Sequence, residues 1–517
     1  MTFEIVFVLL SLLGMMAALI ADKMRPGMVL FSVVVLFLCA GILTPKEMLE
    51  GFSNKGMITV ALLFLVSEGI RQSGTLGQVI KKLLPQGKTT VFKAQLRILP
   101  SVAFISAFLN NTPVVVIFAP IIKHWAKSVK LPATKFLIPL SYVTILGGIC
   151  TLIGTSTNLV VHGMILEAGY EGFTMFELGK VGIFIAIAGI IYLFIFSKRL
   201  LPDARPDTAV PDEEVEEGEK LHRVEAVLGA RFPGINKKLS DFNFQRHYGA
   251  EVKEIKTRNG QRYVDHLEDV VLREGDTLVV MADDTFIPTW GESSVFVLLT
   301  NGNDPDTSGK KKRWLALLLL VLMIVGATVG ELPATKEMFP DIKLDMFFFV
   351  CITTIIMAWT NIFPARKYTK YISWDILITI ACAFAISKAM VNSGVADCVA
   401  KFIIGLSDDY GPHVLLAMVF IITNLFTELI TNNAAAALAF PLALSISAQL
   451  GVSPTPFFVV ICMAASASFS TPIGYQTNLI VQGIGNYKFT DFVRIGLPLN
   501  IITFLISVIL IPLIWNF

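Results

Sequence analysis

Residues 150–163 read Cys-Thr-Leu-Ile-Gly-Thr-Ser-Thr-Asn-Leu-Val-Val-His-Gly, and residues 470–483 read Ser-Thr-Pro-Ile-Gly-Tyr-Gln-Thr-Asn-Leu-Ile-Val-Gln-Gly. Each stretch places a glycine and, four residues later, an asparagine inside an otherwise apolar run. Irregular backbone at membrane depth is tolerated only where protein or a water-filled cavity satisfies its polar groups. Paired interruptions in corresponding segments of two halves indicate the binding site of a membrane transporter.

The composition predicts a polytopic membrane protein. The 517 residues are 54% hydrophobic and 16% charged, whereas soluble domains carry about 25% charged residues. The near-neutral net charge of +2 says nothing about partners, and a nucleic-acid partner is not expected. The six cysteines have no paired or Cys-x-x-Cys spacing, which argues against disulfides and a zinc site. Residues 3–21 lack a basic leader and a cleavage site, so we expect a retained first span.

Two of the apolar segments carry amides near their middle. Asn110-Asn111-Thr112-Pro113 interrupts residues 98–122, and Thr431-Asn432-Asn433 interrupts residues 412–442. Since a spanning helix needs about 20 residues, we interpret both segments as re-entrant helical hairpins with the polar residues at the tip. The remaining apolar segments lie at 3–21, 28–44, 57–75, 134–161, 181–200, 314–331, 346–364, 372–392, 455–482 and 495–516.

The distribution of basic residues predicts the orientation. The second hairpin has Lys401 beside Asp397, Asp408 and Asp409, so we expect it to enter from outside. The first hairpin should enter from the cytoplasm, with both termini outside the cell membrane and residues 201–313 in the cytoplasm. The basic residues around the first hairpin are Arg71, Lys81, Lys82, Lys88, Lys93, Arg97, Lys123, Lys127, Lys130 and Lys135.

The internal repeat extends beyond the two interruptions. Residues 65–74 (Leu-Val-Ser-Glu-Gly-Ile-Arg-Gln-Ser-Gly) align with residues 385–394 (Ala-Ile-Ser-Lys-Ala-Met-Val-Asn-Ser-Gly). The opposite charge bias predicts an inverted-topology repeat. The predicted fold is therefore an all-α polytopic membrane protein with inverted repeats. Its first half covers residues 1–200, with scaffold helices at 3–44, a hairpin at 98–122 and a broken helix at 134–161; its second half covers 310–517, with a hairpin at 412–442 and a broken helix at 455–482.

A polar segment separates the halves. Residues 201–222 predict an acidic linker, and residues 223–290 predict a small cytosolic α/β domain. The absence of a Gly-x-Gly-x-x-Gly sequence argues against a nucleotide-binding Rossmann half. The expected elements are strands at 224–228, 252–256 and 276–281, a helix at 239–248 and a hairpin turn at Asn259-Gly260.

The hairpin tips and the two glycine–asparagine breaks together resemble the divalent anion:sodium symporter family of the ion-transporter superfamily. The insert resembles the TrkA-C (RCK-C) regulatory domain of potassium-uptake proteins, in Phe232–Leu239, Tyr248-Gly249 and Leu272–Val280. The resemblance implies a homodimer with an elevator motion, and members with such an insert are often associated with sulfate. By the resemblance, one sodium site uses Asn110, Asn111, Gly154 and Asn158, a second uses Thr431, Asn432, Gly474 and Asn478, and the anion contacts Asn111, Thr112, Asn432, Asn433 and Thr471.

Both tips depart from the Ser-Asn-Thr sequence of the best-known family members, so dicarboxylate specificity does not carry over. The chemistry still fits an anion with coupling cations. Sodium prefers oxygen ligands, which unwound carbonyls and asparagine side chains supply. The N-terminus of a helix favours an anion. Helix capping alone would also explain Asn and Thr at these positions.

No Arg or Lys lies in these motifs, so cations and dipoles must balance the anion. A dianion that enters an inside-negative cell at 100 mV costs about 4.6 kcal/mol, since one charge costs about 2.3 kcal/mol. Two sodium ions would cancel this cost. Coupling to cations is therefore expected, although the sequence leaves open the number of ions and the choice between Na⁺ and H⁺.

Several other polar residues allow two interpretations each. Glu68 and Lys388 occupy equivalent repeat positions and could pair, or could lie near a membrane boundary. Glu428 could tune the second sodium site or hydrogen-bond to backbone within its hairpin. Arg246, His247 and Tyr248 could bind a regulatory nucleotide, or could form an ordinary solvated helix end.

The sequence thus predicts sodium-coupled symport of a small divalent oxyanion, with sulfate as the first choice. The protein is expected to be embedded in membrane lipid. A dicarboxylate or citrate carrier is the alternative within transport. An ion channel gated by the insert is an alternative of another class, because Thr471-Pro-Ile-Gly-Tyr475 is similar to a potassium filter; its repeat partner Thr151–Thr155 is not. An enzyme is not expected, since no nucleophile or metal-ligand cluster appears among the six histidines.

Overall fold

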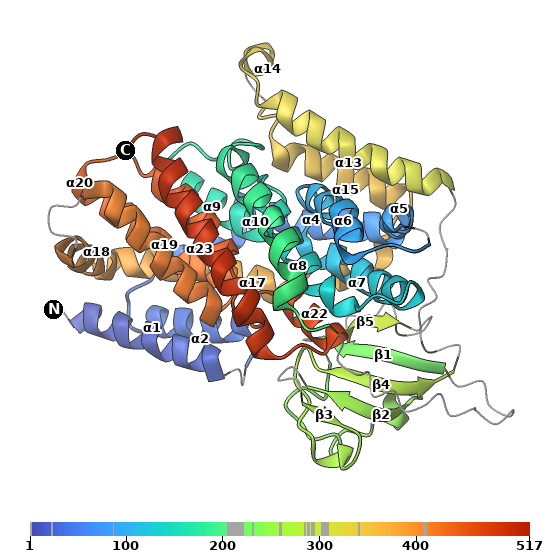
Figure 1. Ribbon diagram of the computed structural model, residues 1–517. Coiled ribbons are helices and arrows are strands. Elements are labelled where there is room, and N and C mark those ends of the chain that lie inside the picture. Colours follow the sequence, from blue (N-terminus) through green and yellow to red (C-terminus); the bar gives the residue numbers. More distant parts are fainter. Residues whose placement is uncertain are drawn as a thin grey trace, which may run out of the picture.

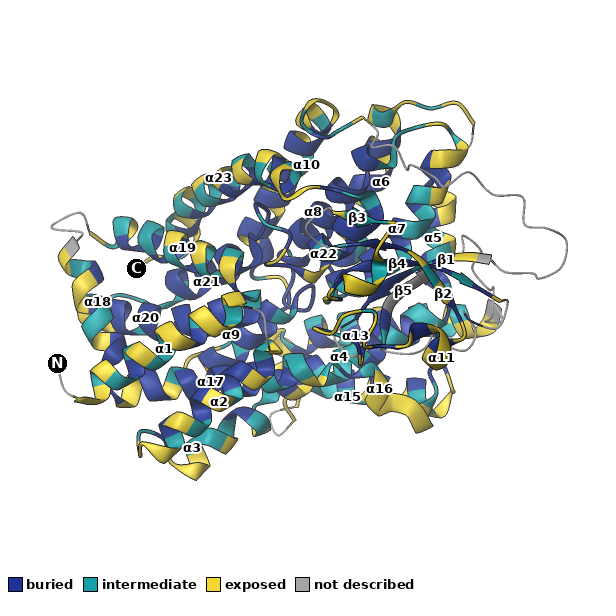
Figure 2. Cartoon of the chain, turned by 90° about the horizontal axis from the view of Figure 1, so that it is seen from below, coloured by how far each residue is buried: buried dark blue, intermediate teal, exposed yellow. Residues whose placement is uncertain are grey.

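The computed structural model describes residues 3–517 apart from 22–23, 86, 204–221, 230–231, 258–260, 284–285, 287–289, 291–294, 301–309, 340–341 and 407–410. Eight described helices are long and apolar enough to cross a membrane. The chain is therefore a mostly helical, multi-span membrane protein with a small inserted sheet, as the composition predicted. Figure 2 shows that the middle of the helical part, around α8, α21 and α22, is buried.

The helices divide into those before and those after the insert, which we call the first and second membrane halves. Those of the first half are α1 (Phe3–Ala21), α2 (Pro26–Cys39), α3 (Pro45–Glu50), α4 (Lys55–Gln72), α5 (Thr75–Leu83), α6 (Val91–Ser106), α7 (Asn111–Ser128), α8 (Leu137–Gly148), α9 (Ser156–Glu167) and α10 (Gly179–Leu200). Those of the second half are α13 (Lys310–Gly330), α14 (Pro333–Met338), α15 (Met346–Trp359), α16 (Tyr368–Tyr371), α17 (Trp374–Asn392), α18 (Val395–Leu406), α19 (Gly411–Leu429), α20 (Asn432–Leu450), α21 (Thr455–Ser466), α22 (Gln476–Gly485) and α23 (Phe489–Ile514).

The backbone repeats itself at matching positions. Gly74 before α5 and Gly394 before α18 have φ of 71° and 75°, a conformation that glycine adopts without strain. Thr155 before α9 has φ −138° and ψ 145°, and Tyr475 before α22 has φ −137° and ψ 129°. The two halves therefore share local geometry as well as sequence pattern.

The halves also pack into one another. Helix α2 of the first half packs on α17 of the second, and α15 of the second packs on α4 of the first. Helices α10 and α23 lie side by side across the middle of the bundle (Figure 1). These helix contacts bury apolar surface between the two halves, so each half needs the other to complete its hydrophobic core.

Each predicted hairpin consists of two helices separated by a short break. The first contains α6 and α7, and α6 begins at Val91 because the Thr90 side chain accepts a hydrogen bond from Lys93 N. The second contains α19 and α20. The two predicted broken helices are the pairs α8–α9 and α21–α22, each interrupted at the glycine–asparagine motif.

The insert forms an antiparallel sheet in the order β3-β2-β4-β1-β5. Its helix α11 (Phe244–Tyr248) is shorter than the predicted 239–248, because the Asn243 side chain accepts from Arg246 N and starts the helix there. The sequence analysis predicted neither the short strand β3 nor the last strand, β5. Most of the predicted linker and the Asn259-Gly260 turn lie outside the described residues. The strands are β1 (His222–Leu228), β2 (Glu251–Lys256), β3 (Arg262–Tyr263), β4 (Thr277–Ala282) and β5 (Phe296–Thr300).

The contacts between the sheet and the membrane halves include a charged cluster and a close approach of backbone. Glu225 on β1 accepts from Lys123 on α7 at 3.0 Å and from Lys256 on β2 at 3.4 Å. A Cβ placed on Gly483 of α22 would lie 2.5 Å from the Thr277 hydroxyl on β4. Figure 1 shows the sheet at this end of the bundle, beside α7 and α22.

Burial raises the pKa of Glu225, but the two lysines outweigh it and lower that pKa from 4.5 to about 2. The carboxylate therefore stabilises the docked sheet at every pH above its unfolded-state pKa, and that contribution disappears as the pH falls towards 2.

We predict that Glu225→Gln destabilises the full-length protein by about 1.5–3 kcal/mol at neutral pH, because the two lysines lose the negative charge of their shared acceptor. The difference in unfolding free energy between wild type and variant should be constant above pH 5 and shrink below pH 4.5, as measured by thermal unfolding in detergent. The exposed pair Glu251–Lys253 supplies the control: Glu251→Gln should cost about 0–1 kcal/mol. Equal losses in the two variants would contradict a specific docking contact.

Candidate functional site

The first interruption is closed by side chains rather than by helical hydrogen bonds. The Asn158 amide donates to Thr151 O at 2.9 Å, and Gly154 N donates to Thr151 Oγ1 at 3.2 Å. The Thr151 hydroxyl in turn donates to Ala107 O, at the end of the first hairpin's α6. These bonds pair polar backbone groups of the unwound segment. Such pairing is required inside a membrane protein, because no water is available there to bind free N–H and C=O groups.

The second interruption repeats the same bonds. The Asn478 amide donates to Thr471 O at 3.2 Å and Gly474 N donates to Thr471 Oγ1 at 3.4 Å. The Thr471 hydroxyl donates to Glu428 O at 3.1 Å, at the end of α19. A Cβ on Gly474 would lie 2.0 Å from Ser468 Oγ, so the break has room only for glycine.

The hairpin tips present helix N-termini. Helix α7 begins at Asn111 and α20 begins at Asn432. The preceding residues, Asn110 and Thr431, have extended ψ angles of 140° and 146°, and neither side chain caps its helix. Capping by these two residues therefore does not account for the polar tips, whose first N–H groups suit an anion.

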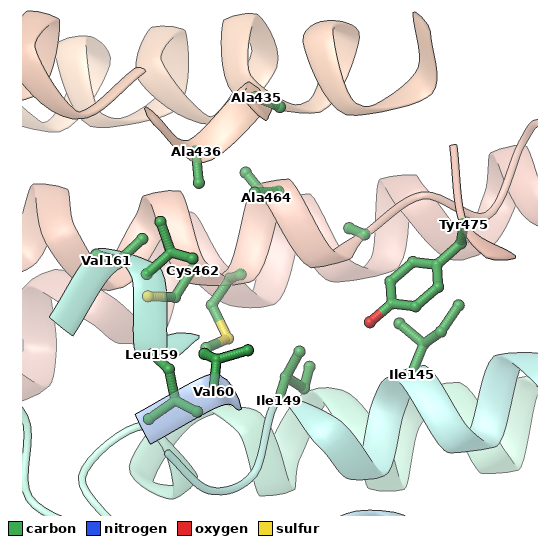
Figure 3. Close-up of a cluster of buried hydrophobic side chains, with 14 of the residues drawn as sticks. Val60, Ile145, Ile149, Leu159, Val161, Ala435, Ala436, Cys462, Ala464 and Tyr475 are labelled. Atoms are coloured by element: carbon green, nitrogen blue, oxygen red, sulfur yellow. The ribbon is translucent and has the colours of Figure 1, made fainter. Parts of the chain in front are cut away.

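The two tips meet at the hydroxyl group of Tyr475. The Asn111 amide donates to this oxygen at 2.6 Å, Thr155 Oγ1 lies 3.0 Å from it, and the Asn432 side chain interacts with it as well. In Figure 3 the Tyr475 ring lies against Ile145 of α8. All three polar partners are neutral. The sequence analysis missed Tyr475, although it occupies the position after the second glycine where the first repeat has Thr155.

Each tip is also held by the broken helix of the opposite half. Thr112 on α7 donates to Gln476 on α22 at 3.3 Å. Asn433 on α20 accepts from Ser156 and Thr157 on α9, at 3.3 and 3.2 Å. The structure thus brings the predicted anion-contacting residues of both halves into one region.

The predicted sodium ligands differ in how free their oxygens are. Asn158 Oδ1 and Thr431 Oγ1 are buried without a hydrogen-bond partner among the described residues. By contrast, Asn478 Oδ1 accepts from Ser141 at 2.7 Å and Asn111 Oδ1 accepts from Ser106 at 2.8 Å. An incoming Na⁺ could therefore use the first two oxygens directly, whereas the other two would have to exchange a hydroxyl partner.

The intramembrane charges take other partners than the suggested pair. Glu68 accepts from Arg71 at 2.6 and 2.7 Å and from Gln72 at 2.6 Å, while Lys388 is exposed on α17. The suggested Glu68–Lys388 pair is therefore not formed, because Arg71 lies one turn from Glu68 on the same helix. Glu428 accepts from the backbone N of Ser470 at 2.9 Å, which belongs to the second interruption rather than to its own hairpin.

The suggested regulatory cluster on α11 does not share one surface. Tyr248 is buried against Phe232 and Phe296 in the core of the insert, with ring centroids 5.8 and 5.2 Å away. Arg246 and His247 are exposed. A nucleotide contacting all three side chains would have to open the aromatic core.

Comparison with known proteins places the chain among transporters. The profile of the family described as citrate transporter (CitMHS) matches residues 16–447 and 341–517. "Uncharacterized transporter sll0640" of Synechocystis is 29% identical over 94% of this chain and 93% of its own length. "Putative sulfur deprivation response regulator" of Chlamydomonas reinhardtii is 28% identical over 93% of this chain and 96% of its own length.

"Sodium/sulfate cotransporter 2" of Chlamydomonas reinhardtii is 31% identical over 54% of this chain and 31% of its own length. The family profile covers nearly the whole chain and includes both interruptions and both hairpin tips. The chain therefore belongs to the citrate-transporter family of secondary transporters, and it is a transporter rather than an enzyme.

Proposed function

We propose that the protein is a sodium-coupled symporter of a small divalent oxyanion, with sulfate as the first candidate. The observation that carries this proposal is the gathering of two helix N-termini around Tyr475 and the broken helices, among neutral amides and hydroxyls. Such donors match oxyanion oxygens. With neutral donors alone, the charge of a dianion has to be balanced by cations that move with it.

Tyr475 also supports a compact substrate. Its ring is buried between the tips, where the first repeat has only a threonine. The phenol therefore fills volume that a longer dicarboxylate would need. Two relatives carry the name sodium/sulfate cotransporter. The name of the matching family favours a second candidate, a citrate or dicarboxylate carrier.

The architecture that we propose is an inverted repeat with two re-entrant hairpins, working as a homodimeric elevator in the lipid of the cell membrane. The exchanged packing of α2 on α17 and α15 on α4 supports two related halves. In Figure 1 the two chain ends lie at one end of the bundle and the sheet at the other. This arrangement supports a cytoplasmic insert with both termini outside.

We further propose that the insert is a TrkA-C-like regulatory domain, supported by its antiparallel strands around an aromatic core. Its docking on α7 and α22 offers a route by which it could act on the site. We do not extend this proposal to a nucleotide ligand, because Tyr248 is part of the aromatic core.

The first test is uptake of labelled sulfate into proteoliposomes that contain the purified protein. We expect an inward sodium gradient to drive uptake and excess succinate or citrate to leave it unchanged. Empty liposomes and a potassium gradient are the controls. Competition by citrate with no sulfate uptake would favour the second candidate, and single-channel currents without gradient-driven accumulation would contradict symport.

The second test removes one tip amide at a time. Asn111→Ala and Asn432→Ala should each reduce uptake at least about tenfold, since a hydrogen bond to a charged group is worth about 1.5–3 kcal/mol. Size-exclusion chromatography should show unchanged assembly. Asn392→Ala is the matched control, because this asparagine lies exposed on α17 and binds Ile42 O. Uptake at the wild-type level in both tip variants would remove the site assignment.

The third test concerns Tyr475. Tyr475→Phe keeps the ring and removes the hydroxyl, so the KM for sulfate should rise about 10-fold or more. Tyr475→Thr copies the residue of the first repeat and should admit succinate as a competitor, because it opens space between the tips. The role in selectivity would be refuted by variants that keep both the wild-type KM and the wild-type discrimination.

A further inference from the structure

Glu428 lies in the last turn of α19, three residues before Thr431 at the tip. Its Oε1 accepts from Ser470 N at 2.9 Å and from Asn500 Nδ2 of α23 at 2.7 Å. The same Asn500 amide donates to Ser470 Oγ at 2.9 Å. The three side chains therefore form one contiguous group of oxygens and amides.

Two oxygens in this group have no partner among the described residues. Glu428 Oε2 is buried and unpartnered. Asn500 is only 6% exposed, and its Oδ1 is likewise unpartnered. Leaving a buried acceptor unsatisfied costs about 1–3 kcal/mol, and more for a charged group. A group that keeps two such acceptors together has capacity for a positively charged ligand.

The other glutamate singled out in an apolar run shows what Glu428 lacks. Glu68 has the guanidinium of Arg71 at 2.6 Å. In the part of the chain that is described, Glu428 forms no ion pair with a basic side chain, and its partners are a backbone N–H and an amide. An ionised carboxylate inside a membrane is costly unless a cation neutralises it.

The first half provides a natural comparison, because its equivalent positions can be identified by identical contacts. Thr471 donates to Glu428 O in the second half, and Thr151 donates to Ala107 O in the first. The position of Glu428 is therefore taken by Ala107. The equivalent of Ser470 is Cys150, the residue that precedes the threonine in each repeat.

Glycines on α10 and α23 identify the third position. A Cβ on Gly182 would lie 2.5 Å from Ile149 O, and a Cβ on Gly496 would lie 2.0 Å from Phe469 O. Ile149 and Phe469 precede Cys150 and Ser470, so the two glycines are equivalent. Four residues after each, one turn along the helix, stand Ala186 and Asn500. In the first half, the positions equivalent to the three polar residues of the group are therefore occupied by Ala or Cys.

The interface between α19 and α23 contains further buried hydroxyl groups without hydrogen-bond partners among the described residues. The helices pack together, with the Phe420 and Phe504 rings 5.3 Å apart. Thr423 on α19 and Ser507 on α23 are fully buried, and their hydroxyl oxygens have no partner among the described residues. Buried hydroxyls are normally satisfied, so this interface differs from an ordinary apolar contact.

We propose that Glu428, Asn500 and Ser470 form an additional Na⁺ site, which exists only in the second half. The inference rests on the proposed sodium coupling and adds to the two sites that the tips suggest. A carboxylate, an amide carbonyl and a hydroxyl are oxygen donors of the kind that hard cations prefer. The carboxylate supplies the compensating charge that the neutral tips do not, so this site should bind sodium without an anion present.

The test measures binding of ²²Na⁺ to the purified full-length protein in detergent, without any anion substrate. Glu428→Gln keeps an acceptor at Oε1 and removes the charge. We expect it to bind one Na⁺ fewer per protomer at saturation, or to raise the half-saturating Na⁺ concentration at least about tenfold, the equivalent of 1.4 kcal/mol. Glu68→Gln is the matched control and should bind as wild type does.

A second variant covers the case in which Glu428→Gln does not fold. Asn500→Ala copies Ala186 of the first half and removes the unpartnered carbonyl, so it should weaken sodium binding in the same direction. Thermal unfolding and size-exclusion chromatography check that each variant is intact. A sodium isotherm identical to wild type in a folded Glu428→Gln or Asn500→Ala protein would overturn the proposed site.

The outcomes also separate this site from the proposed function. If the wild type binds no Na⁺, both the sodium coupling and the additional site are overturned. If the wild type binds Na⁺ and drives sulfate uptake while Glu428→Gln binds identically, only the additional site is overturned. A variant whose uptake changes with pH but whose sodium isotherm matches wild type would replace the sodium site by a proton site.

Discussion

The structure depends on hydrogen bonds to the backbone groups that the two helix interruptions leave unpaired inside an apolar interior. In each half one threonine hydroxyl and one asparagine amide close the interruption, and the same threonine ties it to the end of the neighbouring hairpin. Unpaired backbone polar groups in the membrane cost several kcal/mol each. These few bonds offset that cost and so allow the helix to be unwound at the site. They also fix the hairpin tip beside the break, which positions the site.

The two halves are alike in backbone and different in side chains. Matching dihedral angles before α9 and α22 and matching hydrogen bonds at the breaks give a nearly symmetric frame. Within that frame Thr155 corresponds to Tyr475, and Ala107 corresponds to Glu428. The two halves therefore share a backbone frame, while the side chains at equivalent positions differ in size and charge.

The insert is attached to the elements that build the site. Lys123 belongs to α7, whose N-terminus is the first tip, and Gly483 belongs to α22, whose N-terminus follows Tyr475. Glu225 and Thr277 of the sheet contact these two helices. The sheet therefore contacts one helix from each half, and each of these two helices begins at the candidate site.

The sequence alone determined the membrane class, the two amide-bearing breaks and the repeat, because hydropathy and motif spacing are local properties of the chain. It also indicated three strands of the insert, but not the two-residue β3 or β5, which pairs with β1 across a long stretch of chain. Only the tertiary structure decided that Tyr248 is buried and that the Tyr475 hydroxyl accepts from Asn111 at the first tip. Those outcomes depend on which side chains from distant segments compete for the same partner, and spacing along the chain carries no record of that competition.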